Sequence, residues 1–237
     1  MEPKQRVIVA LDTIDLATAK ALAETLKGSI GGLKIGKEFF TANGPGGVEN
    51  LNALGLPIFL DLKFHDIPNT VGRAVAAATQ LKPKIINVHA SGGREMLIAA
   101  RESAFNTATK MGIQPPIVLG VTVLTSLDDS DLRLVGITHS VSEQVKRLAD
   151  LSQESQLDGV VCSPLEVELL RTHCGPNFQL LTPGIRPEWA QAGDQKRFVT
   201  PSQAVEWGTD FIVIGRPITE AQDPLIAANL VLKELKI

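Results

Sequence analysis

Short apolar runs recur along the chain, and each of them ends in glycine or in polar residues. Segments whose apolar residues repeat with helical spacing lie between most of the runs, for example at 16–28 and 142–156. Strands that alternate with helices are typical of a parallel sheet with both faces covered. The runs that predict strands are VIVALD (7–12), GGLKIG (31–36), PIFLDLKF (57–64), KIINVHA (84–90), IVLGVTVL (117–124), GVVCSP (159–164), QLLTPG (179–184) and FIVIGR (211–216).

Eight strand and helix units in a chain of this length predict an α/β fold of the (β/α)8, or TIM, barrel type. An open doubly wound sheet normally stops at five or six strands and has a GxGxxG turn after the first strand, which this sequence lacks. No linker-like or low-complexity segment divides the chain. We therefore expect a single domain over residues 1–237.

Composition narrows the class of protein. The 237 residues are 44% hydrophobic and 21% charged, which is ordinary for a globular protein with a sizeable core. The net charge of −3 and the scattered basic residues argue against a nucleic-acid partner, and no apolar run is long enough to cross a membrane. Cys162 and Cys174 lack the spacing of a redox or zinc motif, and the first residues lack the pattern of a signal peptide, so we expect free thiols and a cytoplasmic location.

Charged residues stand at the carboxyl ends of the first three predicted strands. Asp12 ends the first, Lys34 lies in the second, and Asp61 and Lys63 end the third. In a barrel these ends converge on one mouth, where active sites of this fold lie. Since side chains alternate along a strand, Asp61 and Lys63 should point to the same side. We expect two acids and two bases that alternate in sign across the mouth.

Two other interpretations of these charges remain. The four side chains could be paired ions that only close one end of the barrel. A metal site could be built from Asp61, His65, Asp66 and His89, but the two lysines already supply the positive charge that a cation would bring.

A second group of candidate residues follows the last two predicted strands, where barrels of this fold often hold a phosphate. Gly215 would let a ligand oxygen approach the backbone, and Arg216 would present a planar fork to a phosphate. The segment 185–199 between these strands is predicted to be a loop that folds over a ligand, with Gln195 as a contact from above.

Taken together, the motifs resemble the bacterial type of the orotidine 5′-phosphate decarboxylase family along the whole chain. The D-x-K-x-x-D core is shared with the keto-gulonate phosphate decarboxylases, whereas Lys34, Gln195 and the Gly215-Arg216 pair are similar to the orotidylate branch. The matching stretches are ALD (10–12), LKIG (33–36), DLKFHDIPNTV (61–71), VTVLTS (121–126), TPGIR (182–186), GDQ (193–195) and VIGRPIT (213–219).

This resemblance implies decarboxylation of orotidine 5′-phosphate to uridine 5′-phosphate (UMP), the last step of de novo UMP synthesis, without metal or other cofactor. Lys63 would oppose the carbanion charge and deliver the proton, and Asp61 would lie near the departing carboxylate. Lys34, together with Asp12, would bind the ribose hydroxyls and complete the charge network. Asp66, also catalytic in the family, would reach the neighbouring subunit's site.

The resemblance also implies a homodimer with shared active sites and further substrate contacts. Thr70 would accompany Asp66 across the interface, and Thr125 and Ser126 would bind the pyrimidine edge. The remaining substrate-binding positions would be Ile67, Pro183, Arg186, Gln195, Gly215 and Arg216, the last four with the 5′-phosphate. The alternatives are a magnesium-dependent decarboxylase of keto-sugar phosphates and a catalytically silent barrel that binds nucleotides.

Overall fold

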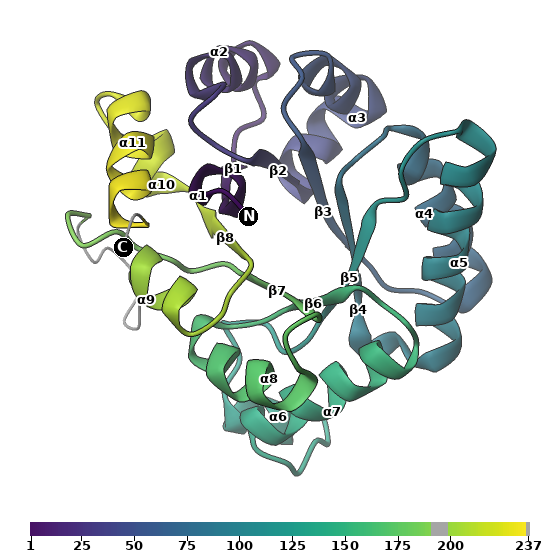
Figure 1. The fold of residues 1–237 in the computed structure, drawn as a ribbon. Coiled ribbons are helices and arrows are strands. Elements are labelled where there is room, and N and C mark those ends of the chain that lie inside the picture. The colour runs from purple at the N-terminus through teal and green to yellow at the C-terminus, as the bar shows by residue number, and fades with distance from the viewer. Residues whose placement is uncertain (191–198, 236–237) are drawn as a thin grey trace.

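The computed structural model describes residues 1–190 and 199–235, which form a closed barrel of eight parallel strands surrounded by helices (Figure 1). Each strand pairs with the next one along the chain, and β1 closes the ring on β8. The predicted (β/α)8 fold is confirmed.

Every predicted run contains a strand, but the fifth strand ends earlier than expected. Its last paired residue, Val121, lies opposite Val161, the last residue of the short sixth strand, so no ladder continues beyond it. Thr125 and Ser126 therefore lie on the loop after the strand, and Asp12 follows the end of the first strand directly. The strands are β1 (Val7–Leu11), β2 (Gly32–Gly36), β3 (Ile58–Phe64), β4 (Ile85–His89), β5 (Ile117–Val121), β6 (Gly159–Val161), β7 (Gln179–Thr182) and β8 (Phe211–Ile214).

Most helices cover the outside of the barrel, and several begin at a side chain that accepts a backbone N–H from the first turn, as Asp15 and Ser140 do. Within residues 1–190 and 199–235, no helix is long and apolar enough to cross a membrane. The helices are α1 (Pro3–Arg6), α2 (Leu16–Leu26), α3 (Lys37–Asn52), α4 (Pro68–Gln80), α5 (Arg94–Met111), α6 (Asp129–Leu134), α7 (Val141–Glu154), α8 (Val167–Cys174), α9 (Pro201–Glu206), α10 (Arg216–Thr219) and α11 (Pro224–Glu234), with short 3₁₀ turns η1 (Ala90–Gly92) and η2 (Pro164–Glu166).

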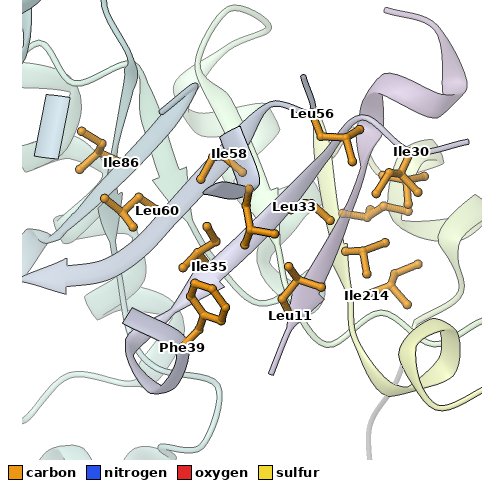
Figure 2. Close-up of a cluster of buried hydrophobic side chains, with 14 of the residues drawn as sticks. Leu11, Ile30, Leu33, Ile35, Phe39, Leu56, Ile58, Leu60, Ile86 and Ile214 are labelled. Carbon is orange, nitrogen blue, oxygen red and sulfur yellow. The ribbon is translucent and has the colours of Figure 1, made fainter. Parts of the chain in front are cut away.

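Alternation along the strands separates two apolar layers. Outward side chains such as Leu33, Leu60 and Ile86 pack between the strands and the helices (Figure 2). Inward side chains such as Phe59 and Ile85 fill the barrel. Because the interior is packed, charged side chains are confined to its ends, and ligands must bind at a mouth.

The loops at the amino ends of the strands are joined by Arg171 in the last turn of α8. Its guanidinium donates to the carbonyl oxygens of Gly175, Phe178 and Gly208 and pairs with the Asp210 carboxylate at 2.7 Å. One side chain thus fixes the approaches to β7 and β8, at the end of the barrel opposite the charged mouth.

We predict that Arg171→Ala lowers the free energy of unfolding by about 2–4 kcal/mol, because it removes several charge-assisted hydrogen bonds and leaves Asp210 without this partner. Urea denaturation at neutral pH measures the loss. Arg94→Ala is the control, since the Arg94 ion pair with Glu154 is exposed and should contribute at most about 1 kcal/mol. Equal losses in the two variants would contradict the assigned role of Arg171.

Candidate active site

A cavity of about 310 Å³ opens at the carboxyl ends of the strands. Its floor is the apolar interior of the barrel, formed by Phe59, Val121, Val161, Leu181 and Val213. The predicted residues Lys34, Asp61, Lys63, Thr125, Ser126 and Pro183 line its walls together with Val123, Leu124 and Cys162. The cavity therefore combines an apolar floor with walls that carry charged and hydroxyl groups.

The four charged residues alternate in sign across the mouth as predicted. Lys34 Nζ lies 3.3 Å from Asp12 Oδ1 and 3.7 Å from Asp61 Oδ2, and Lys63 Nζ lies 2.5 Å from Asp61 Oδ1. Asp12 is exposed, whereas Lys34, Asp61 and Lys63 are largely covered. Asp61 is thus held between two ammonium groups.

Opposing influences set the ionisation of Asp61. Burial is the largest influence and favours the neutral acid, but Lys34, Lys63 and the hydrogen bonds from Lys63 and Asn87 together hold the pKa of Asp61 below its usual value of 3.8. The carboxylate is therefore charged at neutral pH. An ionised acid beside a fixed ammonium can repel a nearby anionic group while it keeps the ammonium charged and oriented.

Simple strand alternation does not extend to Lys63. The pairing of β3 with β4 shifts register between Leu60 and Phe64, and Lys63 has a φ of 52°. Its backbone N–H donates to the side-chain oxygen of Asn87 at 2.8 Å instead of to the ladder. The Lys63 side chain still reaches Asp61, but it does so from an irregular backbone. Regular alternation of side chains along a strand did not predict that backbone conformation.

Asn87 is a polar residue of this site that the sequence analysis missed. It lies in β4, is fully buried, and its amide nitrogen donates to Asp61 Oδ1 at 2.7 Å. The available signal was an amide at an inward position of an otherwise apolar strand, between Ile85 and His89.

The histidines considered as metal ligands lie next to this network. The rings of His65 and His89 have centroids 5.3 Å apart, and burial, reinforced by His65 and nearby lysines, lowers the pKa of His89 to about 4. In the part of the chain that the structure describes, no three His, Cys, Asp or Glu side chains are grouped so that they could hold a metal ion. Asp61, His65, Asp66 and His89 do not form such a group.

Two of the predicted phosphate residues, Gly215 and Arg216, lie at the end of β8. Gly215 directly precedes α10, and a Cβ at Gly215 would lie 3.6 Å from Asp12 Oδ2. This strand end therefore adjoins the charged row, which is formed by Asp12, Lys34, Asp61 and Lys63. Arg216 is exposed, whereas Arg186 is 7% exposed and its backbone N–H donates to Val199. Gln195 lies outside the described residues.

Asp66, Ile67 and Thr70 do not line the cavity. Asp66 and Ile67 precede α4, Thr70 lies in its first turn, and all three are exposed, Ile67 at 65%. Asp61 and Lys63 thus line the cavity, whereas these three residues of the same motif do not.

A protein-family model described as Orotidine 5′-phosphate decarboxylase / HUMPS family matches residues 5–231. A relative named orotidine 5′-phosphate decarboxylase from Paramagnetospirillum magneticum is 56% identical over 229 residues, which cover 97% of each chain. A relative of the same name from Rhodospirillum rubrum is 53% identical over 230 residues, which cover 97% of this chain and 93% of the relative. The solved structure of orotidine 5′-phosphate decarboxylase from Lactobacillus acidophilus is 40% identical, with a TM-score of 0.86 and coverage of 98% and 99%.

The ionised state of Asp61 gives a pH prediction. Because its pKa is lower in the folded chain than the usual 3.8, its ionisation stabilises the fold above that pH and is lost as the pH falls through the folded-state pKa. We expect the free energy of unfolding to fall more steeply from about pH 5 to pH 3 in the unmutated protein than in Asp61→Asn. Urea denaturation across this range is the measurement, and parallel curves would contradict the prediction.

Proposed function

The chain belongs to the orotidine 5′-phosphate decarboxylase / HUMPS family, and we propose that it converts orotidine 5′-phosphate to UMP and carbon dioxide. The observation that carries the proposal is the Lys63 ammonium, held 2.5 Å from the buried Asp61 carboxylate at the wall of an apolar cavity. This arrangement provides a fixed positive charge and a proton where a carbanion would form.

The reaction breaks the bond between C6 of the pyrimidine and its carboxylate carbon. The electron pair of that bond stays on C6 as carbon dioxide leaves, and no neighbouring carbonyl group is placed to delocalise it. Lys63 opposes this charge electrostatically and transfers a proton from Nζ to C6, and the neutral amine then takes a proton from water. Asp61 lies beside the departing carboxylate and destabilises it by repulsion.

The lining of the cavity, apolar on its floor and polar on its walls, suits a pyrimidine ring as its occupant. The pyrimidine would lie on the apolar floor, with Pro183 at one wall and Thr125 and Ser126 at its polar edge. The ribose would contact Asp12 and Lys34 at the start of the charged row.

The 5′-phosphate would then reach the end of β8. Gly215 and Arg216 form its binding site, and Gln195 and Arg186 are assigned to the same group on the strength of the family motifs. Since the phosphate is remote from C6, its binding energy serves to position the substrate rather than to alter the reacting bond.

The proposal includes a reaction without metal or organic cofactor, in the last step of de novo UMP synthesis. It also includes a cytoplasmic setting, which the two free, buried cysteines favour. The rivals are a magnesium-dependent decarboxylase of keto-sugar phosphates and a silent nucleotide-binding barrel. Lys34 next to Asp61 supplies positive charge inside the site, which favours the cofactor-free reaction over the magnesium-dependent one.

We further propose a homodimer in which each subunit contributes to its partner's site. Asp66, Ile67 and Thr70 follow β3, are exposed and do not line their own cavity, and Ile67 exposes a large apolar side chain. A two-fold axis at this edge would bury Ile67 and bring Asp66 to the partner's site.

We predict that Lys63→Ala lowers turnover of orotidine 5′-phosphate at least about 100-fold, since it removes both the opposing charge and the proton donor. The loss of substrate absorbance, followed in excess EDTA, measures turnover, and titration with UMP should show that product binding is retained.

Lys110→Ala is the matched control for this prediction, because Lys110 is exposed in the last turn of α5, at the other end of the barrel. Its turnover should equal that of the unmutated protein. Near-normal turnover of Lys63→Ala would exclude the role assigned to Lys63. If the folded, unmutated protein lacks turnover until magnesium is added, the keto-sugar phosphate reaction becomes the better proposal.

A second prediction tests the shared sites. Lys63→Ala and Asp66→Ala homodimers should each be inactive, but a heterodimer would contain one site with both Lys63 and Asp66. Random mixing makes half of the dimers heterodimers, so activity should return to about a quarter of the unmutated level. The assay follows dissociation and reassociation of tagged subunits. Confirmed heterodimers without recovery would refute the sharing.

A further inference from the structure

We propose that Asn87 is a positioning residue for the Asp61 and Lys63 pair, acting through both residues without touching the substrate. The inference rests on the proposed decarboxylation. Asn87 is fully buried below the mouth, is absent from the residues lining the cavity, and bonds to both members of the pair.

The orientation of the Asn87 amide follows from its two partners. The backbone N–H of Lys63 can only donate, so it must face the amide oxygen, at 2.8 Å. The ionised carboxylate of Asp61 can only accept, so it must face the amide nitrogen, at 2.7 Å. A side chain with one acceptor and one donor in this fixed arrangement satisfies both, and neither leucine nor an ionised aspartate of similar size does.

The irregular backbone explains why an amide is needed here. Between Leu60 and Phe64 the ladder to β4 shifts register, and Lys63 has a left-handed φ that costs energy for a residue with a Cβ. The Lys63 N–H finds its partner in the Asn87 side chain. Asn87 therefore stabilises the backbone conformation from which the Lys63 side chain starts.

The same amide determines which oxygen of Asp61 faces which lysine. Asp61 Oδ1 accepts from Asn87 Nδ2 and from Lys63 Nζ, whereas Oδ2 faces Lys34. Loss of the amide would free the carboxylate to rotate and the Lys63 backbone to relax. A displacement of the ammonium by about 1 Å is enough to lower a rate about 100-fold.

The first test is Asn87→Ala, with Val88→Ala as the matched control. Val88 lies next to Asn87 in β4, is fully buried, and packs on the outer, helix-facing side. We expect Asn87→Ala to lower kcat about 10- to 100-fold while the Kd for UMP changes less than about threefold. Val88→Ala should lose stability but keep kcat, when both variants are assayed well below their melting temperatures.

The second variant, Asn87→Asp, has a signature in its pH profile that a structural role would not produce. It keeps the acceptor for Lys63 but places a second carboxyl group against Asp61 Oδ1, so the two acids share a proton and the new group's pKa is raised. Below that pKa the protonated acid donates as Asn87 does. The charged and titratable groups nearby, Lys34, Lys63 and His89, are present in all variants, and rates divided by those of the unmutated protein isolate the effect of the residue at position 87.

We therefore expect the relative kcat of Asn87→Asp to rise at least about tenfold from pH 8 to pH 5, while that of Asn87→Ala stays flat. A kcat of Asn87→Ala within about twofold of the unmutated protein would overturn the inference, as would equal losses in Val88→Ala or parallel pH profiles of the two Asn87 variants. Absence of turnover in the unmutated protein would instead overturn the proposed function.

Discussion

The buried carboxylate of Asp61 is the constraint on which the site depends. A charge at 8% exposure is tolerated only with compensating partners, and Asp61 has two ammonium groups and an amide. Those partners come from β2, β3 and β4, so the positions of three neighbouring strands are tied to one side chain. The barrel supplies this arrangement because parallel strands end together on one face.

The two ends of the barrel use charge differently. At the amino ends, Arg171 satisfies backbone carbonyl groups and one carboxylate, so its bonds hold loops together. At the carboxyl ends, the charges of Lys34, Asp61 and Lys63 line a cavity and pair with one another. The apolar interior between them separates the two sets of charges.

The barrel could be predicted because its cause is local and repeated: apolar runs with strand spacing alternate with helical segments. The charges of Asp12, Lys34 and Asp61 could be predicted for the same reason, since these residues lie in or directly after three successive apolar runs. The irregular backbone at Lys63 could not, because it arises from a shift between β3 and β4. Asn87 was missed along with it, since its partners lie 24 and 26 residues away and become visible only when the strands pair.

The closure of β1 on β8 brings together residues from the two ends of the chain. Asp12, Lys34, Asp61, Lys63 and Asn87 all belong to the first ninety residues, whereas Gly215 and Arg216 follow the last strand. Asp12 lies next to Gly215 at the seam where the ring closes. During synthesis, the first ninety residues leave the ribosome long before the eighth strand does. The two parts of the mouth cannot come together until that strand has emerged. Completion of the barrel is therefore also the step that assembles the site.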